Sequence, residues 1–229
     1  MSMPPQQFTP ELQLNTLFER DSEGRILHTR EPNPSTGSLF ALVRSRTECA
    51  WAVHRDVPDN VADQLDALAR TEPPAKELAD EPVHAARYHA LAGGRIDAGP
   101  VFTIPADIAT QDDIAAVTDL SQLEKHFHGW APNEIAGCSP ILAVMKDGHA
   151  VSVCFCARRS ELAAEAGLET AAAFRRRGFG GRVTAAWARA IQASERLPIY
   201  STSWSNTASR AVARKLGLAS CAADWTLSP

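Results

Sequence analysis

The stretch Phe174-Arg-Arg-Arg-Gly-Phe-Gly-Gly-Arg182 decides the fold, because a helical pattern begins directly after it. Val183, Trp187 and Ile191 recur there at the spacing of one helix face. Glycines let backbone N–H groups approach a ligand closely, a helix N-terminus adds positive potential, and arginines add charge-assisted hydrogen bonds. A glycine- and arginine-rich turn that opens a helix therefore predicts a site for a phosphate group.

The segments around this turn predict a strand before it and a strand after its helix. Residues 162–170 are expected as the first strand, although their alanines and glutamates also suit a helix, and residues 199–204 are expected as the second. The turn lacks the G-K-[ST] of a Walker A loop and the G-x-G-x-x-G of a dinucleotide-binding turn. The predicted phosphate site is therefore of another kind.

A second motif, Asn206-Thr-Ala-Ser-Arg-Ala-Val-Ala-Arg-Lys-Leu-Gly-Leu218, follows the second strand. The turn resembles the R-x-x-G-x-G acyl-CoA pyrophosphate loop of the GNAT acyltransferase superfamily, with Arg175, Gly178 and Gly180 at the motif positions. The second motif is similar to that superfamily's N-x-x-[AS]-x-x-L-Y-x-K-L-G-F helix. The two motifs in this order resemble the GNAT superfamily over residues 101–229, whereas the first hundred residues carry no such motif.

This resemblance implies an α/β fold with a mixed, mostly antiparallel sheet and helices on both faces. We expect a GNAT-like acyl-CoA-binding domain at residues 97–229, preceded by a small α+β domain at residues 1–96. The implied activity is that of an N-acetyltransferase, in which a primary amine attacks the thioester of acetyl-CoA directly. Acetyl-CoA is then the co-substrate, and no metal is required.

In the superfamily, two neighbouring parallel strands diverge so that the pantetheine arm of CoA can pair with their exposed backbone. Residues 168–170 and 200–203 would flank this divergence here. Asn206 would contact the arm, cap its own helix, or do both. The residues that the resemblance implies for acetyl-CoA binding are Leu168, Thr170, Arg175, Arg176, Arg177, Gly178, Phe179, Gly180, Gly181, Asn206 and Ser209.

Two glutamates are the candidate catalytic residues. An amine acceptor arrives protonated, so the enzyme benefits from a base. Glu165 and Glu169 lie on the strand that leads into the loop, and their spacing points both side chains to one face of the sheet. The sequence departs from the superfamily at Ala213, where many members have a tyrosine that protonates the departing thiolate; water, Ser203 or Tyr200 could replace it.

Elsewhere, alternation and turn residues predict further elements. We expect strands at residues 12–18, 25–29, 38–44, 49–54, 101–104, 139–145 and 150–157. Helical patterns occupy residues 60–69 and 81–91, and shorter ones occupy residues 112–117 and 120–127. A turn at Asp147-Gly148 joins the last two of these strands as a hairpin.

The charge distribution agrees with an anion site near the first motif. The 229 residues carry a net charge of −4, yet residues 171–220 hold nine basic side chains and one acidic one. The five cysteines include no C-x-x-C pair, the N-terminal residues show neither a basic start nor an apolar run, and no stretch is as long and apolar as a membrane span. We therefore expect a cytoplasmic protein without a nucleic-acid or membrane partner, and a homodimer stays open.

Two other functions remain as alternatives. The missing tyrosine leaves room for an acyl-CoA-binding sensor without turnover. Residues 208–217 also suit the basic second helix of a helix-turn-helix regulator, although the strand expected before them stands where such a motif needs its first helix. Binding of acetyl-CoA without thiol release would favour the sensor, and salt-dependent DNA binding would favour the regulator.

Overall fold

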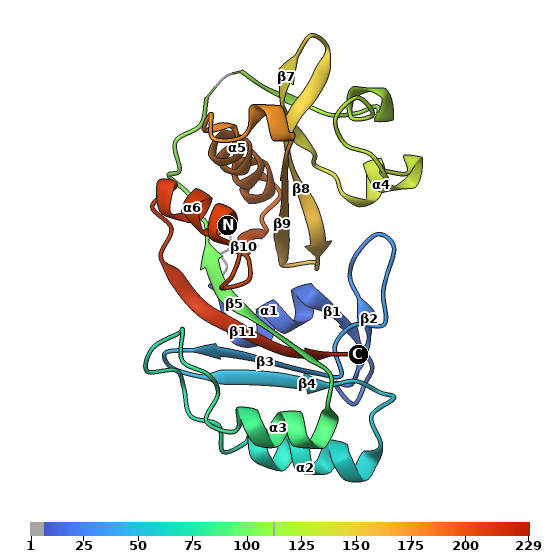
Figure 1. The fold of residues 1–229 in the computed structure, drawn as a ribbon, viewed down its shortest axis with the longest axis vertical. Helices are drawn as coiled ribbons and strands as arrows, with labels where there is room; N and C mark the ends of the chain where they lie inside the picture. Colours follow the sequence, from blue (N-terminus) through green and yellow to red (C-terminus); the bar gives the residue numbers. More distant parts are fainter. Residues whose placement is uncertain (1–6, 112) are drawn as a thin grey trace, which may run out of the picture.

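A nine-stranded sheet runs through the computed structural model, which describes residues 7–111 and 113–229 (Figure 1). The strand order is β4-β3-β11-β5-β10-β9-β8-β7-β6, and every neighbouring pair is antiparallel except β9 with β10. The strands are β3 (Phe40–Ser45), β4 (Cys49–Val53), β5 (Arg95–Thr103), β6 (Ile114–Ala116), β7 (Leu142–Lys146), β8 (His149–Arg159), β9 (Ala163–Thr170), β10 (Leu197–Ser201) and β11 (Ser220–Ser228). A separate hairpin pairs β1 (Phe18–Arg20) with β2 (Ile26–Thr29).

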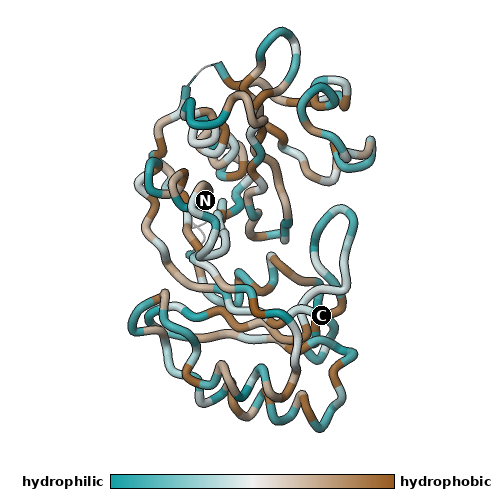
Figure 2. The backbone as a smooth tube through the Cα atoms, viewed as in Figure 1, coloured by the Kyte–Doolittle hydropathy of each residue, from teal (hydrophilic) through white to brown (hydrophobic). Residues whose placement is uncertain are grey.

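Helices cover both faces of this sheet. They are α1 (Pro10–Leu17), α2 (Asp59–Ala69), α3 (Ala85–Ala92), α4 (Pro132–Gly137), α5 (Phe179–Ala193) and α6 (Thr207–Lys215), with short 3-10 turns at Leu120–Gln122 and Ala172–Phe174. Apolar and polar residues alternate along α2 and α3 in Figure 2, as expected for helices with one buried face. None of the helices in residues 7–111 and 113–229 combines the length and the apolar character needed to span a membrane.

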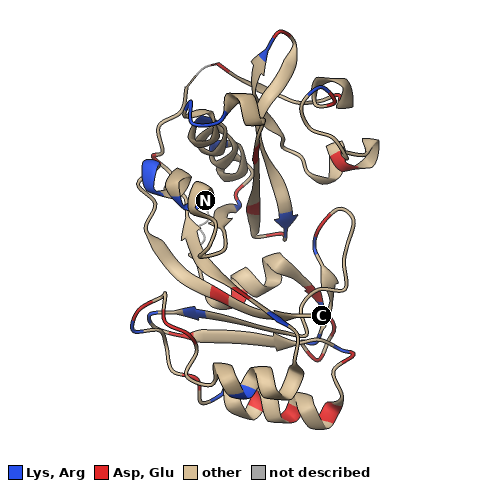
Figure 3. Ribbon diagram, in the orientation of Figure 1, with Lys and Arg blue, Asp and Glu red and all other residues tan. Residues whose placement is uncertain are grey.

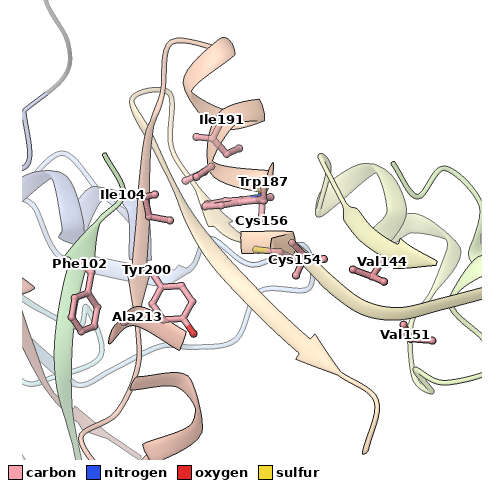
Figure 4. Packing of buried hydrophobic residues seen from close by; sticks show 13 residues of the cluster. Phe102, Ile104, Val144, Val151, Cys154, Cys156, Trp187, Ile191, Tyr200 and Ala213 are labelled. Atoms are coloured by element: carbon pink, nitrogen blue, oxygen red, sulfur yellow. The ribbon is translucent and has the colours of Figure 1, made fainter. Parts of the chain in front are cut away.

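Alternate residues of the central strands pack into two different cores. Ala163 and Ile199 lie in the core on the α1 side, whereas Ala164 and Tyr200 lie in the core on the α5 side. Trp187 of α5 is fully buried in the second core, which Figure 4 shows. Because side chains of a strand alternate between its two faces, one face of β9 and β10 packs against α1 and the other packs against α5. The mixed α/β fold predicted from the sequence is confirmed.

The first helix corrects the strand predicted at residues 12–18. Pro10 stands at the first turn of α1, and Thr9 caps it by accepting a hydrogen bond from the backbone N–H of Leu12 at 3.1 Å. Gln13 and Thr16 are both fully buried. The alternation was misleading because polar side chains of α1, as well as its leucines, face the sheet.

The short helix predicted at residues 112–117 is also wrong where the structure describes it. Ile114–Ala116 forms the edge strand β6 and pairs with Leu142 to Val144 of β7, while Asp112 lies outside the described residues. The helix predicted at residues 120–127 is only a 3-10 turn at Leu120–Gln122. The hairpin turn at Asp147-Gly148 and the strand over residues 162–170 are confirmed as β7–β8 and β9.

The first half of the chain shares its sheet with the second half. β11 pairs with β3 on one side and with β5 on the other, so a C-terminal strand joins β3 and β4 to the rest. The boundary expected between residues 96 and 97 lies inside β5. The division into two domains is therefore not confirmed and stays a prediction.

Candidate functional site

The two parallel strands separate after a short common stretch. β9 and β10 pair only from Ala163 with Leu197 to Glu165 with Ile199. Beyond this point β9 follows β8 as far as Thr170, while β10 follows β5, and the backbone N–H of Trp204 donates to the oxygen of Ala98 at 2.9 Å. The facing edges of residues 166–170 and 200–203 thus present backbone groups that need partners, at the divergence expected from the sequence.

The glycine- and arginine-rich loop lies at the end of β9 and opens α5. Gly178 occupies the N-cap position of α5 with φ of +82°, a left-handed conformation that glycine adopts without strain. No side chain at this position accepts a hydrogen bond from the first N–H groups of the helix. Among residues 7–111 and 113–229, no acceptor receives a hydrogen bond from the N–H groups of residues 177–181. Unpaired N–H groups at a helix N-terminus form a ready anion site.

Arginine side chains fix this loop and surround it with positive charge. Arg175 donates to the backbone oxygen of Thr170 at 3.1 Å and so ties the loop to the end of β9. Arg177 donates to the oxygen of Ala173 at 3.0 Å, and its guanidinium lies 5.1 Å from the centre of the Phe174 ring. Arg176 is exposed. The ribbon is blue at this end of α5 in Figure 3, where arginines lie.

The two glycines at the start of α5 allow close packing. A Cβ atom on Gly180 would lie 3.4 Å from Leu168 of β9 and 3.5 Å from Val212 of α6. A Cβ atom on Gly181 would lie 3.6 Å from Leu216. Phe179, between Gly178 and Gly180, stacks its ring 5.4 Å below the guanidinium of Arg182. The first turn of α5 therefore packs directly against β9, which borders the divergence, and against α6.

Asn206 caps α6, which is one of the two roles expected for it. Its Oδ1 accepts a hydrogen bond from the N–H of Ser209 at 3.0 Å. The Ser209 hydroxyl in turn hydrogen-bonds to the hydroxyl of Tyr200, which is buried, and burial raises the pKa of Tyr200 to about 12. Ser209 thus links α6 to the strand that borders the gap.

Ala213 lies in the hydrophobic core, at the position where the motif has a tyrosine. Only 1% of its surface is exposed, and Figure 4 shows it beside Tyr200. The core has no room for a phenol on this side of α6 unless neighbouring side chains move.

A cavity of about 510 Å³ opens on the opposite face of the sheet, the face covered by α1. Glu165 of β9 and Ser201 of β10, which stand at the divergence, both line it. Of the described residues that line the cavity, nine are serine or threonine, so its wall is strongly polar. The gap between the strands and the cavity therefore meet at Glu165.

Glu165 is almost completely buried, with 2% of its surface exposed. Its Oε1 accepts hydrogen bonds from Ser201 and from Gln13, and its Oε2 accepts one from Arg158 at 2.7 Å. Arg158 also pairs with Glu31, another lining residue. The carboxylate is therefore held in one orientation at the edge of the cavity.

Glu169 lies on the same face of β9, four residues further along, and does not line this cavity. The Phe155 ring covers Gly167 between the two glutamates. Desolvation raises the pKa of Glu169. At about 3.3 Å per residue the two backbone positions lie roughly 13 Å apart, so the structure does not bring the candidate bases together.

The sequence analysis missed Asp224 and Gln13. Asp224 lies on β11, lines the cavity, and accepts a hydrogen bond from Gln13 at 3.1 Å. Burial and the charge of Glu165 raise its pKa from 3.8 to about 8. The sequence did offer one signal, because Asp224 is a single acid among the apolar residues Ala222, Ala223, Trp225 and Leu227. An acid within an apolar strand is rarely buried unless it is paired or has a function.

One family model matches a part of the second half of the chain. Residues 145–225 match the family model described as FR47-like protein. The search of the curated proteins found no match to this chain.

Several solved structures are similar to more than half of the chain. A Drosophila protein has a TM-score of 0.51 and 15% identity over 79% of this chain and 70% of its own. A GNAT-family acetyltransferase from Colwellia psychrerythraea has a TM-score of 0.47 and 14% identity, over 78% and 76%. A GNAT-family protein from Novosphingobium aromaticivorans has a TM-score of 0.47 and 18% identity over 58% of this chain, which spans only 64% of that protein.

The match to the FR47-like family model spans both sequence motifs, and the Drosophila structure shares the overall fold of this chain.

Proposed function

We propose that the protein transfers an acetyl group from acetyl-CoA to a primary amine. One observation supports this most strongly: a gap between two parallel strands has the unpaired amides of the α5 N-terminus at one end and a polar cavity with a buried carboxylate at the other. The gap suits an extended ligand with amide groups, the amides suit a phosphate, and the cavity suits an acceptor.

The residues proposed for acetyl-CoA lie along this gap. The N–H groups of residues 177–181 would hold the pyrophosphate, assisted by Arg176 and Arg177. The backbone from Leu168 to Thr170 would pair with the pantetheine arm, and the Asn206 side-chain amide could reach it from the N-terminus of α6, beside Ser209. Arg175 supports the loop through its bond to Thr170. The backbone N–H and C=O groups that lack hydrogen-bond partners in this region fit a ligand with phosphate and amide groups.

Acetyl-CoA supplies an acetyl group on a thioester whose thiolate is a tolerable leaving group near neutral pH. The deprotonated amine attacks the carbonyl carbon, a C–N bond forms, and the C–S bond breaks. Backbone N–H groups at the diverging edge would stabilise the negative oxygen of the tetrahedral intermediate. Of the two glutamates expected as bases, Glu165 lines the cavity at the divergence and would lie beside the reacting position, and the role of Glu169 stays a prediction.

The sensor and the regulator are the competing functions. β10 occupies residues 197–201, where a helix-turn-helix would need its first helix, so the fold gives the regulator no support. Thiol release separates the enzyme from the sensor. We expect CoA and an acetylated amine to form from acetyl-CoA and a panel of primary amines, with the product identified by mass. Tight binding of acetyl-CoA without release across the panel would contradict the proposed transfer.

A further inference from the structure

Two carboxyl groups on different strands, the buried Glu165 and the partly buried Asp224, share one amide donor. The side-chain nitrogen of Gln13 donates to Glu165 at 3.4 Å and to Asp224 at 3.1 Å. An amide nitrogen carries two hydrogens, so a single side chain can serve both acids. Gln13 is fully buried on α1, which packs over this face of the sheet. Glu165 and Asp224 therefore form a pair of fixed geometry within the cavity.

The two carboxyl groups differ in whether both of their oxygens receive a hydrogen bond. Both oxygens of Glu165 are engaged by Gln13, Ser201 and Arg158. Asp224 receives only the Gln13 hydrogen bond, on Oδ2, and among the described residues no donor reaches its buried Oδ1. A buried polar atom without a partner is costly and needs an explanation. The free acceptor atom of the pair is thus Asp224 Oδ1.

The backbone after β10 packs closely against β5 next to Asp224. Asp224 lies opposite Gly99 of β5, where a Cβ atom would lie only 1.7 Å from the backbone oxygen of Thr202, and Gly99 lines the cavity together with Asp224. Asp97, two residues before Gly99, faces the same side and lines the cavity further out. Acids therefore extend across the cavity floor from the divergence of the strands outward.

The cavity wall indicates the class of acceptor. Serine and threonine hydroxyls dominate the lining, and Leu17, Phe18, Ala98 and Pro229 are the described lining residues with apolar side chains. Hydroxyls donate and accept hydrogen bonds with polar groups of a ligand, while acids attract a cation. A small, hydrophilic primary amine in its ammonium form matches this wall.

We propose that Asp224 takes a proton from the ammonium group of a small hydrophilic acceptor, while Glu165 orients that group at the strand divergence. This inference rests on the proposed acetyl transfer. The N–H bond breaks, the proton moves to the Asp224 carboxylate directly or through one water, and the nitrogen keeps the electron pair that attacks the thioester. After the new C–N bond has formed, the nitrogen loses its second proton to the departing CoA thiolate, which leaves as the thiol.

The ionisation of Asp224 fits this role. Burial and the neighbouring charges of Glu165 and Asp97 raise its pKa, whereas Gln13 and Arg158 lower it, and the result is about 8. A base with a pKa near the working pH is the most effective. The charged groups that line the cavity around Asp224 are Glu165 on β9, Arg158 on β8, Asp97 and Arg95 on β5 and Glu31 after β2; α1 contributes the uncharged Gln13 and β3 the apolar Val43.

The test compares four proteins in the CoA-release assay, with ethanolamine, glucosamine, putrescine and hexylamine as probes. These proteins are the wild type, Asp224→Asn, Asp97→Asn and Asp63→Asn, the last removing an exposed acid on α2 outside the cavity. We expect Asp224→Asn to lower kcat/KM for the amine about 100-fold above pH 8, with acetyl-CoA affinity unchanged. The deficit should shrink below pH 8, where Asp224 is already protonated.

Asp97→Asn gives a readout that a purely structural role would not change. Removing its negative charge should lower the pKa of Asp224 and shift the acidic limb of the kcat/KM profile to lower pH. The Asp63→Asn variant should follow the wild type. Full activity of Asp224→Asn at every pH would overturn the proposal, and hexylamine as the best acceptor would overturn the acceptor class. A wild type that binds acetyl-CoA and acetylates none of the amines would instead contradict the proposed function itself.

Discussion

At the scale of single residues, Asp224 makes the stability of the protein depend on pH. Its folded pKa of about 8 lies above the ordinary value of 3.8, because burial disfavours the charged form. Between these two values the folded protein holds a proton that the unfolded chain has released. The contribution of Asp224 to the free energy of unfolding is therefore largest at low pH and falls as the pH rises from about 4 to about 8.

The Asp224→Asn variant should remove this dependence. Relative to wild type, its free energy of unfolding should increase between pH 5 and pH 8 by on the order of a few kcal/mol, since one proton corresponds to about 1.4 kcal/mol per pH unit. Urea unfolding of both proteins at the two pH values measures the difference. Parallel curves for wild type and variant would show that Asp224 ionises normally in the folded protein.

Ala213 provides a second prediction at this scale. A tyrosine here must displace core side chains, so Ala213→Tyr should lose about 1–3 kcal/mol of stability. The matched control is Ala208→Tyr, because Ala208 is exposed on the same helix. Chemical unfolding should separate the two variants clearly. An Ala213→Tyr protein as stable as the control would mean that the core beside Tyr200 can accept a phenol.

At the scale of secondary-structure elements, substitutions of two glycines test whether the loop before α5 binds acetyl-CoA. Gly178 has φ of +82° and Gly148, in the β7–β8 turn, has φ of +79°, and no described atom lies within 4 Å of a Cβ added to either. Alanine at either position should cost about 1–2 kcal/mol. Only Gly178→Ala should also reduce the rise in Tm caused by acetyl-CoA, because its Cβ stands where phosphate must approach.

Differential scanning fluorimetry with and without acetyl-CoA provides the measurement. Equal ligand responses in Gly178→Ala and Gly148→Ala would remove the α5 N-terminus from the proposed binding site.

The same elements show which parts of the fold the sequence could predict. The loop, α5, β10 and α6 were predictable because their signals are local: glycines, a helical apolar face and an N-cap asparagine. α1 was not, because Gln13 and Thr16 are buried polar residues and break the pattern of an amphipathic helix. β6 was not, because its three residues gain their conformation from pairing with β7.

At the scale of the whole molecule, the cavity depends on strand order. Asp224 meets Gln13 and Glu165 because β11 lies between β3 and β5 and because α1 crosses the same face. These three residues are separated by up to 211 positions in the sequence. Their proximity could not be read from local patterns, whereas Glu165 could be singled out from its position before the loop.

The shared sheet also predicts how the molecule unfolds. β11 hydrogen-bonds to β3 over six residue pairs and to β5 over eight, and the α1-side core contains residues of both halves, such as Val43 and Ile199. Calorimetry should therefore record a single transition with equal calorimetric and van't Hoff enthalpies. Two separated transitions would favour independent domains at residues 1–96 and 97–229.

A crystal structure of the complex would test directly whether acetyl-CoA binds in the gap between β9 and β10. We expect the pyrophosphate on the N–H groups of residues 177–181, the pantetheine arm against the backbone of Leu168 to Thr170, and the acetyl group beside Glu165 at the cavity. A complex in which acetyl-CoA lies elsewhere, or crystals that stay free of it at saturating concentration, would show that the gap is not the binding site.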